Sequence, residues 1–521
     1  MTRATKVATQ VRHLDPFIGA LFGLCVVSRL LLGLAGVGMD LRALGPDSAT
    51  HLYQLLDTAW LRRDLLHSVW SLTMQPPLYN LAVGLLLDLP GAAQSPMVAI
   101  VMFAGYVVTV LCSYGAMVLL GVTRRAAFVV TLVLVVLDPA QLLFSTNIFY
   151  ATPTAALTAA TAFLGIWTLA APSFRRVLGF ASCGGVLTLT NTMLQPMVLL
   201  IVLAALVIAL PRFRRILLLG SLVPALVLVG WMGLSVSRVG TPATSTWFGM
   251  NVAHGVLKPA DPMLLASMVA AGQMPPRSLV NPFTAPLSAI GVSPVRAGPR
   301  ASSAATRPDG LPNLNNRAYV TVSSHSLADA LTFIRHQPAT WLSIRWRALV
   351  LWAVPADQYY FFTHDTAVAP AVRSYDAFVG LQASHHPHLS KEIWRGMTIS
   401  PLQVSWTLLG ETLLALFGGI IVIWRAAASR RRWALAVGLP WVLATQAFVV
   451  STLTEYGENN RFRFEVSGPI LVVATVVAVL AIEYLRRPAD GGVTGRLDAL
   501  GWGELNPTQQ DTGSTRATEA I

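Results

Sequence analysis

The chain is dominated by apolar runs about as long as a helix that crosses a bilayer. Examples are Val98–Leu120, Ile216–Val236, Leu402–Trp424 and Phe464–Leu485. A helix needs about 20 apolar residues to span the hydrocarbon, where lipid offers the backbone no hydrogen-bond partner. Only 12% of the 521 residues are charged, against roughly a quarter in a soluble domain. The sequence therefore predicts an all-α polytopic integral membrane protein.

The basic residues stand at the ends of these apolar runs. The clusters are Arg124-Arg125, Arg175-Arg176, Arg212–Arg215, Arg430–Arg432 and Arg486-Arg487. Arginine at the ends of spans is typical of cytoplasmic loops under the positive-inside rule. The formal net charge of +13 therefore indicates anchoring to membrane lipids, and we expect no nucleic-acid partner.

This rule assigns a side of the membrane to each loop. We expect about ten crossings of the cell membrane, with both chain ends in the cytoplasm. Leu78–Leu89 has only about twelve residues, which favours a re-entrant helix that does not cross. The expected crossings are Pro16–Gly36, Val98–Leu120, Ala126–Phe144, Tyr150–Ala171, a short pair within 177–210, Ile216–Val236, Leu402–Trp424, Trp433–Val450 and Phe464–Leu485.

These crossings divide the chain into six parts. They are a cytoplasmic N-terminus with the first span (1–36), a first outer loop with the re-entrant helix (37–97), a transmembrane bundle (98–236), an outer region (237–401), the C-terminal spans (402–485) and a disordered cytoplasmic tail (486–521). The outer region contains a short apolar stretch with Arg345 and Arg347, which favours a helix lying along the interface. The cysteines are scattered in separate apolar runs, so we expect neither a disulfide set nor a metal site or other cofactor.

The first outer loop contains the sequence "PDSATHLY". Asp47 follows a Gly-Pro turn, and His51 stands four residues later, on the same face of a helix. One interpretation makes Asp47 the N-cap of a surface helix. The other makes it a general base that removes a proton from an incoming nucleophile. Both interpretations remain open at this point.

Four further polar side chains are candidates for ligand binding. Gln75 and Tyr79 flank the Pro76-Pro77 pair that begins the short helix. Asn147 lies near the outer end of the third span, and His254 lies in a stretch rich in turn residues. Each of them also has an ordinary structural interpretation, as a helix-end or loop hydrogen-bonding group.

The stretch "EYGENNRFRF" precedes the last span and carries Glu458, Arg461 and Arg463. A guanidinium at the outer membrane edge suits a phosphate, because its donor fork is always charged and matches two oxyanion oxygens. Two residues apart on a helix, the two arginines diverge by about 200°, so only an irregular segment would turn both to one ligand. The alternatives are contact with lipid headgroups or ion pairs with Glu455 and Glu458.

Taken together, these motifs resemble the GT-C superfamily of polytopic glycosyltransferases, which use sugars linked to polyprenyl phosphate. The nearest branch includes the protein O-mannosyltransferases and the aminoarabinose transferases. The matching features are Asp47 in the first outer loop, the Pro76–Tyr79 segment, a "P…R…W" region from Pro338 to Trp346, and "ENNRFRF" before the last span. They are spread over most of residues 14–485, and their order and sidedness carry the resemblance more than any single string does.

The resemblance implies an inverting glycosyltransferase with its active site outside the cytoplasm. Asp47 would be the general base, Arg461 or Arg463 would stabilise the departing polyprenyl phosphate, and a glycan, lipid or protein would accept the sugar. The chain departs from the family pattern in two places. Ser48 follows Asp47 where the family usually has a second acid, and Asn147 stands in the region where another acid is often found.

Two other classes of function fit a membrane protein of this kind. A transporter or flippase for a lipid-linked saccharide would carry charge at the membrane midplane and inverted repeats. No such repeat is visible, and the charge is concentrated at the outer edge, which favours the enzyme. A non-catalytic envelope scaffold would use the long outer region to bind partners.

Overall fold

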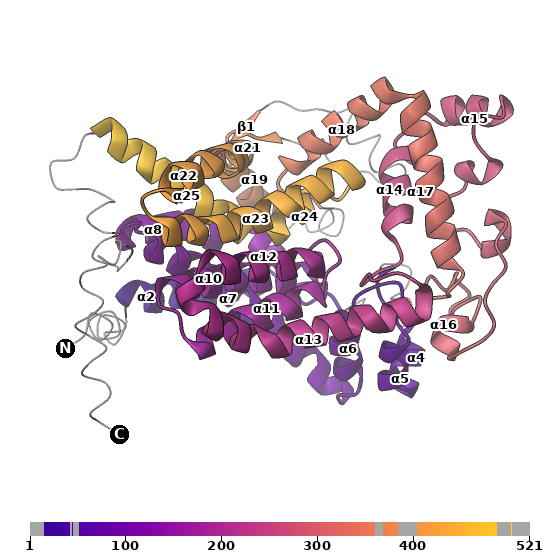
Figure 1. Cartoon of the computed structure of the whole chain (residues 1–521), viewed down its shortest axis with the longest axis horizontal. Helices are drawn as coiled ribbons and strands as arrows, with labels where there is room; N and C mark the ends of the chain where they lie inside the picture. The colour runs from indigo at the N-terminus through magenta and orange to yellow at the C-terminus, as the bar shows by residue number, and fades with distance from the viewer. Residues whose placement is uncertain are drawn as a thin grey trace.

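The structure is a computed structural model that describes residues 15–41, 44, 52–359, 368–383, 404–486, 497 and 502. Its regular secondary structure is helical except for one antiparallel pair of two-residue strands, β1 (Gln382–Ala383) and β2 (Val404–Ser405). Long helices lie side by side in a bundle, and α14 (Phe248–Leu257), α15 (Pro262–Ala270) and α17 (Tyr319–His336) stand at one end of it (Figure 1).

Within the described residues, seven helical segments are long and apolar enough to cross a membrane. They are α2 (Pro16–Leu34), α7 (Gly91–Leu119), α10 (Ala151–Ala170), α13 (Arg214–Val239) with the preceding η3 (Pro211–Phe213), α21 (Trp406–Leu413) continued through η7 (Leu414–Gly418) into α22 (Gly419–Ala427), α23 (Arg431–Thr454) and α25 (Ser467–Arg486). Many of their side chains face outward and are apolar, as lipid contact requires. The expectation of an all-α chain is therefore confirmed, and the seven candidate spans support a multi-pass membrane protein.

The other three expected crossings are also helical, but they are shorter or interrupted. Two of them are α11 (Phe174–Thr188) and α12 (Pro196–Ala209). The third consists of α8 (Arg124–Thr131), the π-helical η2 (Leu132–Val136) and α9 (Pro139–Phe144). This chain of helices is interrupted because Pro139 has no N–H to donate, and the Asp138 carboxylate caps the new helix by accepting from the Ala140 N–H at 3.0 Å. The total of about ten crossings therefore remains a prediction.

Contacts between helix ends show that the helices alternate in direction. At one end, Arg124 at the start of α8 pairs with Asp15 before α2 at 3.4 Å, and Arg432 at the start of α23 donates to the Leu169 carbonyl at the end of α10. At the other end, Asn147 after α9 donates to Asp40 after α2 at 3.0 Å. Arg124 and Arg432 thus lie at the end of the bundle opposite Asp40 in the first outer loop, as the positive-inside rule predicts.

The first outer loop and the outer region contribute shorter elements at that second end. They are α4 (Thr58–Arg63), α5 (Leu65–Trp70), α6 (Pro77–Leu87), η4 (Pro276–Leu279), η5 (Leu287–Ile290), α16 (Arg300–Ser303), α18 (Pro338–Trp352), η6 (Ala356–Gln358) and α19 (Ala369–Phe378), and the C-terminal part of the chain adds α24 (Asn459–Glu465). The Asn315 side chain links the two regions, since it accepts from the Thr73 N–H at 2.8 Å and donates to the Ser71 carbonyl. The irregular stretch 273–317 is therefore tied down by buried amides in spite of its few helices.

Helix α18, the expected interfacial helix, turns one face toward the bundle. Arg345 is buried and donates to the carbonyls of Thr452 and Glu455 at the end of α23, and to that of Gly255 in α14. The free carbonyls at a helix C-terminus favour a cation. Burial lowers the pKa of Arg345 to about 10, although the nearby Glu455 opposes this shift. Arg345 thus holds the outer region against the segment that leads into α24.

Candidate functional site

The candidate site is built around α24, the short helix between α23 and α25. The chain leaves α23 and turns at Gly457, whose φ of 109° favours glycine. Asn459 fixes the turn, because its side chain accepts from the Gly457 N–H and donates to the Ser451 carbonyl and hydroxyl at 3.0 Å. The polar helix "NNRFRFE" is consequently held inside the protein and not on its surface.

Arg461 is the centre of a buried charged cluster. Its side chain is 1% exposed, and its guanidinium donates to Glu458 through Nε and Nη2 and to Glu465 through Nη1. Three aromatic rings surround its Cζ, those of Phe149 and Tyr150 at 5.2 Å and that of Phe462 at 4.2 Å. Two carboxylates and the aromatic faces therefore already balance the charge of Arg461.

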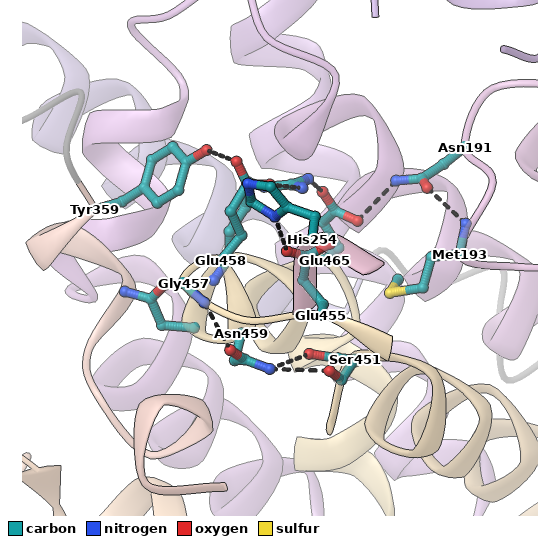
Figure 2. Close-up of polar contacts among 12 residues, drawn as sticks. Asn191, Met193, His254, Tyr359, Ser451, Glu455, Gly457, Glu458, Asn459 and Glu465 are labelled. Atoms are coloured by element: carbon teal, nitrogen blue, oxygen red, sulfur yellow. Dashed lines mark hydrogen bonds and ion pairs between the residues drawn. The ribbon is translucent and has the colours of Figure 1, made fainter. Parts of the chain in front are cut away.

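Two side chains from distant helices complete this Arg461 cluster (Figure 2). The Asn191 amide, between α11 and α12, donates to Glu465 Oε2 at 2.7 Å. The Tyr359 hydroxyl, just after η6, donates to Glu458 Oε1 at 3.1 Å. Figure 2 shows Tyr359 and Asn191 reaching the cluster from opposite sides. Glu458, which precedes α24, and Glu465, which ends it, thus each accept hydrogen bonds from Arg461 and from one neutral side chain.

The charges in this cluster reinforce one another. Burial alone would lower the pKa of Arg461, but Glu458, Tyr150 and Glu465 together raise it well above its ordinary value. Burial alone would raise the pKa of Glu458, but Arg461, with help from the Tyr359 hydrogen bond, lowers it below the usual range. The Glu458–Arg461 pair is therefore ionised at neutral pH.

A small polar cavity adjoins the Arg461 cluster, with about 220 Å³ of empty space when the part open to solvent is included. We call it the Asn191 cavity, and its lining is Gln54, Gln75, Pro76, Tyr79, Asn80, Tyr150, Thr190 and Asn191. Asn191 and Tyr150 belong to both the cavity and the surroundings of Arg461. Amide and phenol side chains offer donors and acceptors without a fixed charge, which suits the hydroxyl groups of a polar ligand.

The structure brings several of the predicted site residues together. Gln75 and Tyr79 both line the Asn191 cavity, and Glu458 and Arg461 form the adjacent cluster. His254 is next to it, with its Nδ1 3.7 Å from Glu455 Oε1. The predicted general base Asp47 and its neighbour His51 lie outside the described residues, so their roles remain predictions.

Two other predicted residues lie elsewhere. The Asn147 side chain donates to the Asp40 carboxylate at 3.0 Å, and the backbones of the two residues form an isolated β-bridge. Asn147 therefore joins the first outer loop to the end of α9. Arg463 faces a separate pocket with Asp138 and Glu411. The reason is the regular helix, because residues two apart on α24 point in divergent directions and cannot serve one ligand. Within the described ranges, no three His, Cys, Asp or Glu side chains are grouped as metal ligands.

Sequence reasoning missed three residues of the site, namely Asn191, Tyr359 and Glu465. Glu465 was included in the apolar last span, although α25 begins only at Ser467. A signal for it was present, since Arg461 and Glu465 are four residues apart, the spacing of an ion pair on a helix. Asn191 and Tyr359 had no such local signal, because their partners are far away in the sequence.

Comparison with known proteins gives no relative from which a role can be transferred. No protein-family model matches the chain, and neither the curated proteins nor the solved structures include a match.

Proposed function

We propose that the chain is a membrane glycosyltransferase of the GT-C type. It would transfer a sugar from a polyprenyl phosphate to an acceptor on the outer side of the cell membrane. The observation that supports this most directly is the meeting of the Asn191 cavity with the Arg461 cluster. Here the neutral side chains of the first outer loop that line the cavity lie next to α24, the charged helix before the last span. This junction lies at the end of the bundle opposite the arginine clusters, which is the expected outer end.

In this proposal the cavity and the cluster have different tasks. Gln75, Tyr79 and Asn191 would hold sugar hydroxyl groups, and Arg461 would bind the phosphate of the donor. Because Glu458 and Glu465 already engage Arg461, the phosphate would have to displace one of them. Glu458, whose side chain is 27% exposed against none for Glu465, is the partner that would give way.

The reaction would be a single displacement at the anomeric carbon. Asp47 would take the proton of the acceptor hydroxyl, the new C–O bond would form, and the bond to the phosphate oxygen would break with its electrons. The phosphate leaves as an anion, which a guanidinium stabilises more strongly than it stabilises the bound donor. Attack from the opposite side inverts the anomeric configuration.

The test is sugar transfer by the purified protein in lipid nanodiscs. The substrates are radiolabelled polyprenyl-phosphate hexoses and pentoses, with membrane lipid, glycan and protein fractions as acceptors. Asp47→Asn is expected to lower the transfer rate about 100-fold or more, as the loss of a general base does. Tyr79→Phe and Gln75→Ala should raise the donor KM. The matched carboxylate control is Asp261→Asn, at an exposed helix cap in the outer region.

Loss of activity in an Arg461 variant alone would be ambiguous, since Arg461 is also structural. The informative variant is therefore Asp47→Asn, which leaves the Arg461 cluster intact. If Asp47→Asn transferred sugar at the wild-type rate, Asp47 would be excluded as the general base. If the wild-type protein transferred sugar from none of these donors, the proposed function would be overturned.

A second candidate function is transport of a lipid-linked saccharide. One observation favours it, namely that Glu411 lies within a membrane-spanning segment and Asp138 at the break in another expected crossing. Ionisable groups at such positions often mark transport paths. Proteoliposomes separate the two candidates, because a transporter would move labelled lipid-linked saccharide between leaflets without changing it, whereas the enzyme would release free polyprenyl phosphate.

A further inference from the structure

A second polar cavity lies beside α24, facing Arg463 and not Arg461. Its empty space measures about 540 Å³ when the part open to solvent is included, and we call it the Arg463 pocket. It shares no lining residue with the Asn191 cavity, so it is a separate site. Its polar lining is Asp138, Tyr375, Asp376, Ser405, Thr407, Glu411, Arg463 and Ser467.

Two side chains of opposite charge in this lining have unsatisfied atoms. Arg463 is 6% exposed, and its Nε has no hydrogen-bond acceptor in the part of the chain that the structure describes. Glu411 Oε1 is buried in the same part of the chain without a donor. The two side chains line one pocket, yet these atoms do not satisfy each other. Because buried polar atoms are nearly always hydrogen-bonded in folded proteins, the pocket suits a ligand that accepts from Arg463 and donates to Glu411.

Most of the hydroxyl groups in the lining use their protons inside the protein. Three of them donate to backbone carbonyls, namely Tyr375 to Val133, Ser405 to Gly380 and Thr407 to Val379. A hydroxyl whose proton is engaged can only accept a hydrogen bond from a ligand. These three hydroxyls therefore present acceptors to the pocket, as the carboxylates do, whereas the Arg463 guanidinium presents donors.

This lining restricts the chemistry of the ligand, which must carry several donors and at least one acceptor. An organic ammonium ion has no acceptor for Arg463, and a phosphate or carboxylate anion has no donor for Glu411. A metal ion needs several ligands around one point, and the described ranges contain no such group of His, Cys, Asp or Glu side chains. A hydroxyl group both donates and accepts, so a molecule with several hydroxyls meets both needs.

The acceptors are also spread around the pocket. Asp138 precedes α9, Tyr375 lies in α19 and Glu411 lies in α21. An amide carries its donors on one nitrogen, whereas the hydroxyls of a sugar ring point outward in several directions. The lining includes apolar side chains as well, among them Leu408 and Leu471, which suit the C–H faces of such a ring.

We propose that the Arg463 pocket binds a polyhydroxylated molecule, that is, a sugar or a related polyol. One hydroxyl oxygen would accept from Arg463, and the neighbouring hydroxyls would donate to Glu411 and Asp138. The polyol is either a soluble sugar or the hydroxylated headgroup of a lipid. This binding site does not depend on the proposed glycosyl transfer.

The test is saturation-transfer NMR of the purified protein in phosphatidylcholine nanodiscs, which avoid glycoside detergents. The probes are methyl glucoside and myo-inositol. The control is 2-methoxytetrahydropyran, a smaller ring with the same acetal oxygens and no hydroxyl group. We expect saturable binding of at least one probe, and at least tenfold weaker binding of the control. Equal binding of the control would overturn the proposal, and so would saturable binding of neither probe, the result for a pocket that holds only water.

Variants separate this pocket from the Asn191 cavity, where sugar hydroxyls are also proposed to bind. Arg463→Met and Glu411→Met each remove one unsatisfied group and should weaken probe binding at least tenfold, whereas Asp261→Asn, at an exposed helix cap, should leave it unchanged. Replacing a buried unpaired charge with an apolar side chain is often neutral or stabilising, so thermal unfolding should show that both variants fold. Wild-type probe binding in both methionine variants would place the sugar elsewhere and overturn the proposal.

Nanodiscs of a second lipid distinguish the two sources of the polyol. Phosphatidylglycerol carries two free hydroxyls in its headgroup, whereas phosphatidylcholine carries none. If a lipid headgroup occupies the pocket, phosphatidylglycerol should weaken methyl glucoside binding at least tenfold. If the ligand is a soluble sugar, binding should be equal in the two lipids. Because these experiments measure binding and not transfer, their failure would leave the proposed function standing.

Discussion

Asn191 donates a hydrogen bond of 2.7 Å to Glu465, a residue 274 positions further along the chain. Asn191 follows α11, and Glu465 ends α24, so this contact joins the middle of the bundle to the start of its last helix. Asn191 also lines the polar cavity, and Glu465 pairs with Arg461. One amide therefore couples the candidate ligand cavity to the charged cluster that borders it.

Replacing Asn191 with alanine should destabilise the protein by about 1–3 kcal/mol, because Glu465 Oε2 would stay buried without a donor. The measurement is the thermal unfolding of the purified protein in detergent. Thr192→Ala, at the neighbouring half-buried position, is the matched control and should unfold within a degree or two of wild type, since a surface change costs less than about 0.5 kcal/mol. Equal unfolding temperatures for Asn191→Ala and Thr192→Ala would contradict the role given to this contact.

Replacing Arg461 with methionine should cost about 3–5 kcal/mol, because the buried Glu465 and the partly buried Glu458 lose their cation. The double variant Arg461→Met/Glu465→Gln should recover part of that loss, since it removes one of the stranded charges. Chemical unfolding of the single and double variants gives both values, and Arg335→Met, at an exposed arginine near the end of α17, serves as the control. If the double variant were less stable than Arg461→Met, the loss of stability would not come from the unpaired Glu465 carboxylate.

The global architecture could be predicted from the sequence, because each span carries its own signal. The apolar run Val98–Leu120 became α7 and Tyr150–Ala171 became α10, within a few residues at most ends. The positions of Arg124 and Arg432 also predicted which helix ends lie at one end of the bundle, since arginine favours the cytoplasmic side. The break at Pro139 was missed, because the residues on both sides of Asp138 and Pro139 are apolar and together have the length of one continuous span.

The site could be predicted only in part, since its contacts are not local. Glu458 and Arg461 were found because they are close in sequence and unusual next to a span. The partners Asn191 and Tyr359 were not, because a single polar residue in a turn gives no sign of where its hydrogen bond goes. The sequence left open whether Arg461 meets a phosphate, lipid headgroups or nearby glutamates, and the fold buries Arg461 and pairs it with Glu458 and Glu465.

The Glu458–Arg461 pair should make stability depend on pH in a defined direction. In the folded protein the pKa of Glu458 is lowered. The ion pair therefore stabilises the protein at pH values above about 4.3, the ordinary pKa of a glutamate. This stabilisation is lost as the pH falls through the lowered pKa that Glu458 has in the folded protein. The measurement is the difference in unfolding temperature between wild type and Glu458→Gln from pH 7 to pH 3. It should be constant down to about pH 5 and then shrink. A difference that grows as the pH falls would have the wrong sign.

The last prediction concerns Gly255, where α14 meets the end of α23. A Cβ at this position would lie 2.5 Å from the Thr454 carbonyl oxygen and 3.1 Å from the Glu455 nitrogen, both backbone atoms that cannot rotate away. Gly255→Ala should therefore push α14 off α23 and cost about 1–3 kcal/mol. Since His254 and Glu455 flank this contact, the variant should also lower the proposed sugar transfer.

The matched control is Gly185→Ala in α11, where a Cβ would meet no atom within 4 Å. There the substitution should be neutral or stabilising by up to about 1 kcal/mol, because alanine favours a helix more than glycine does. Thermal unfolding of the two variants side by side measures the difference. If Gly255→Ala were as stable as Gly185→Ala, α14 and α23 would have to be farther apart than described, and His254 would then lie outside the site.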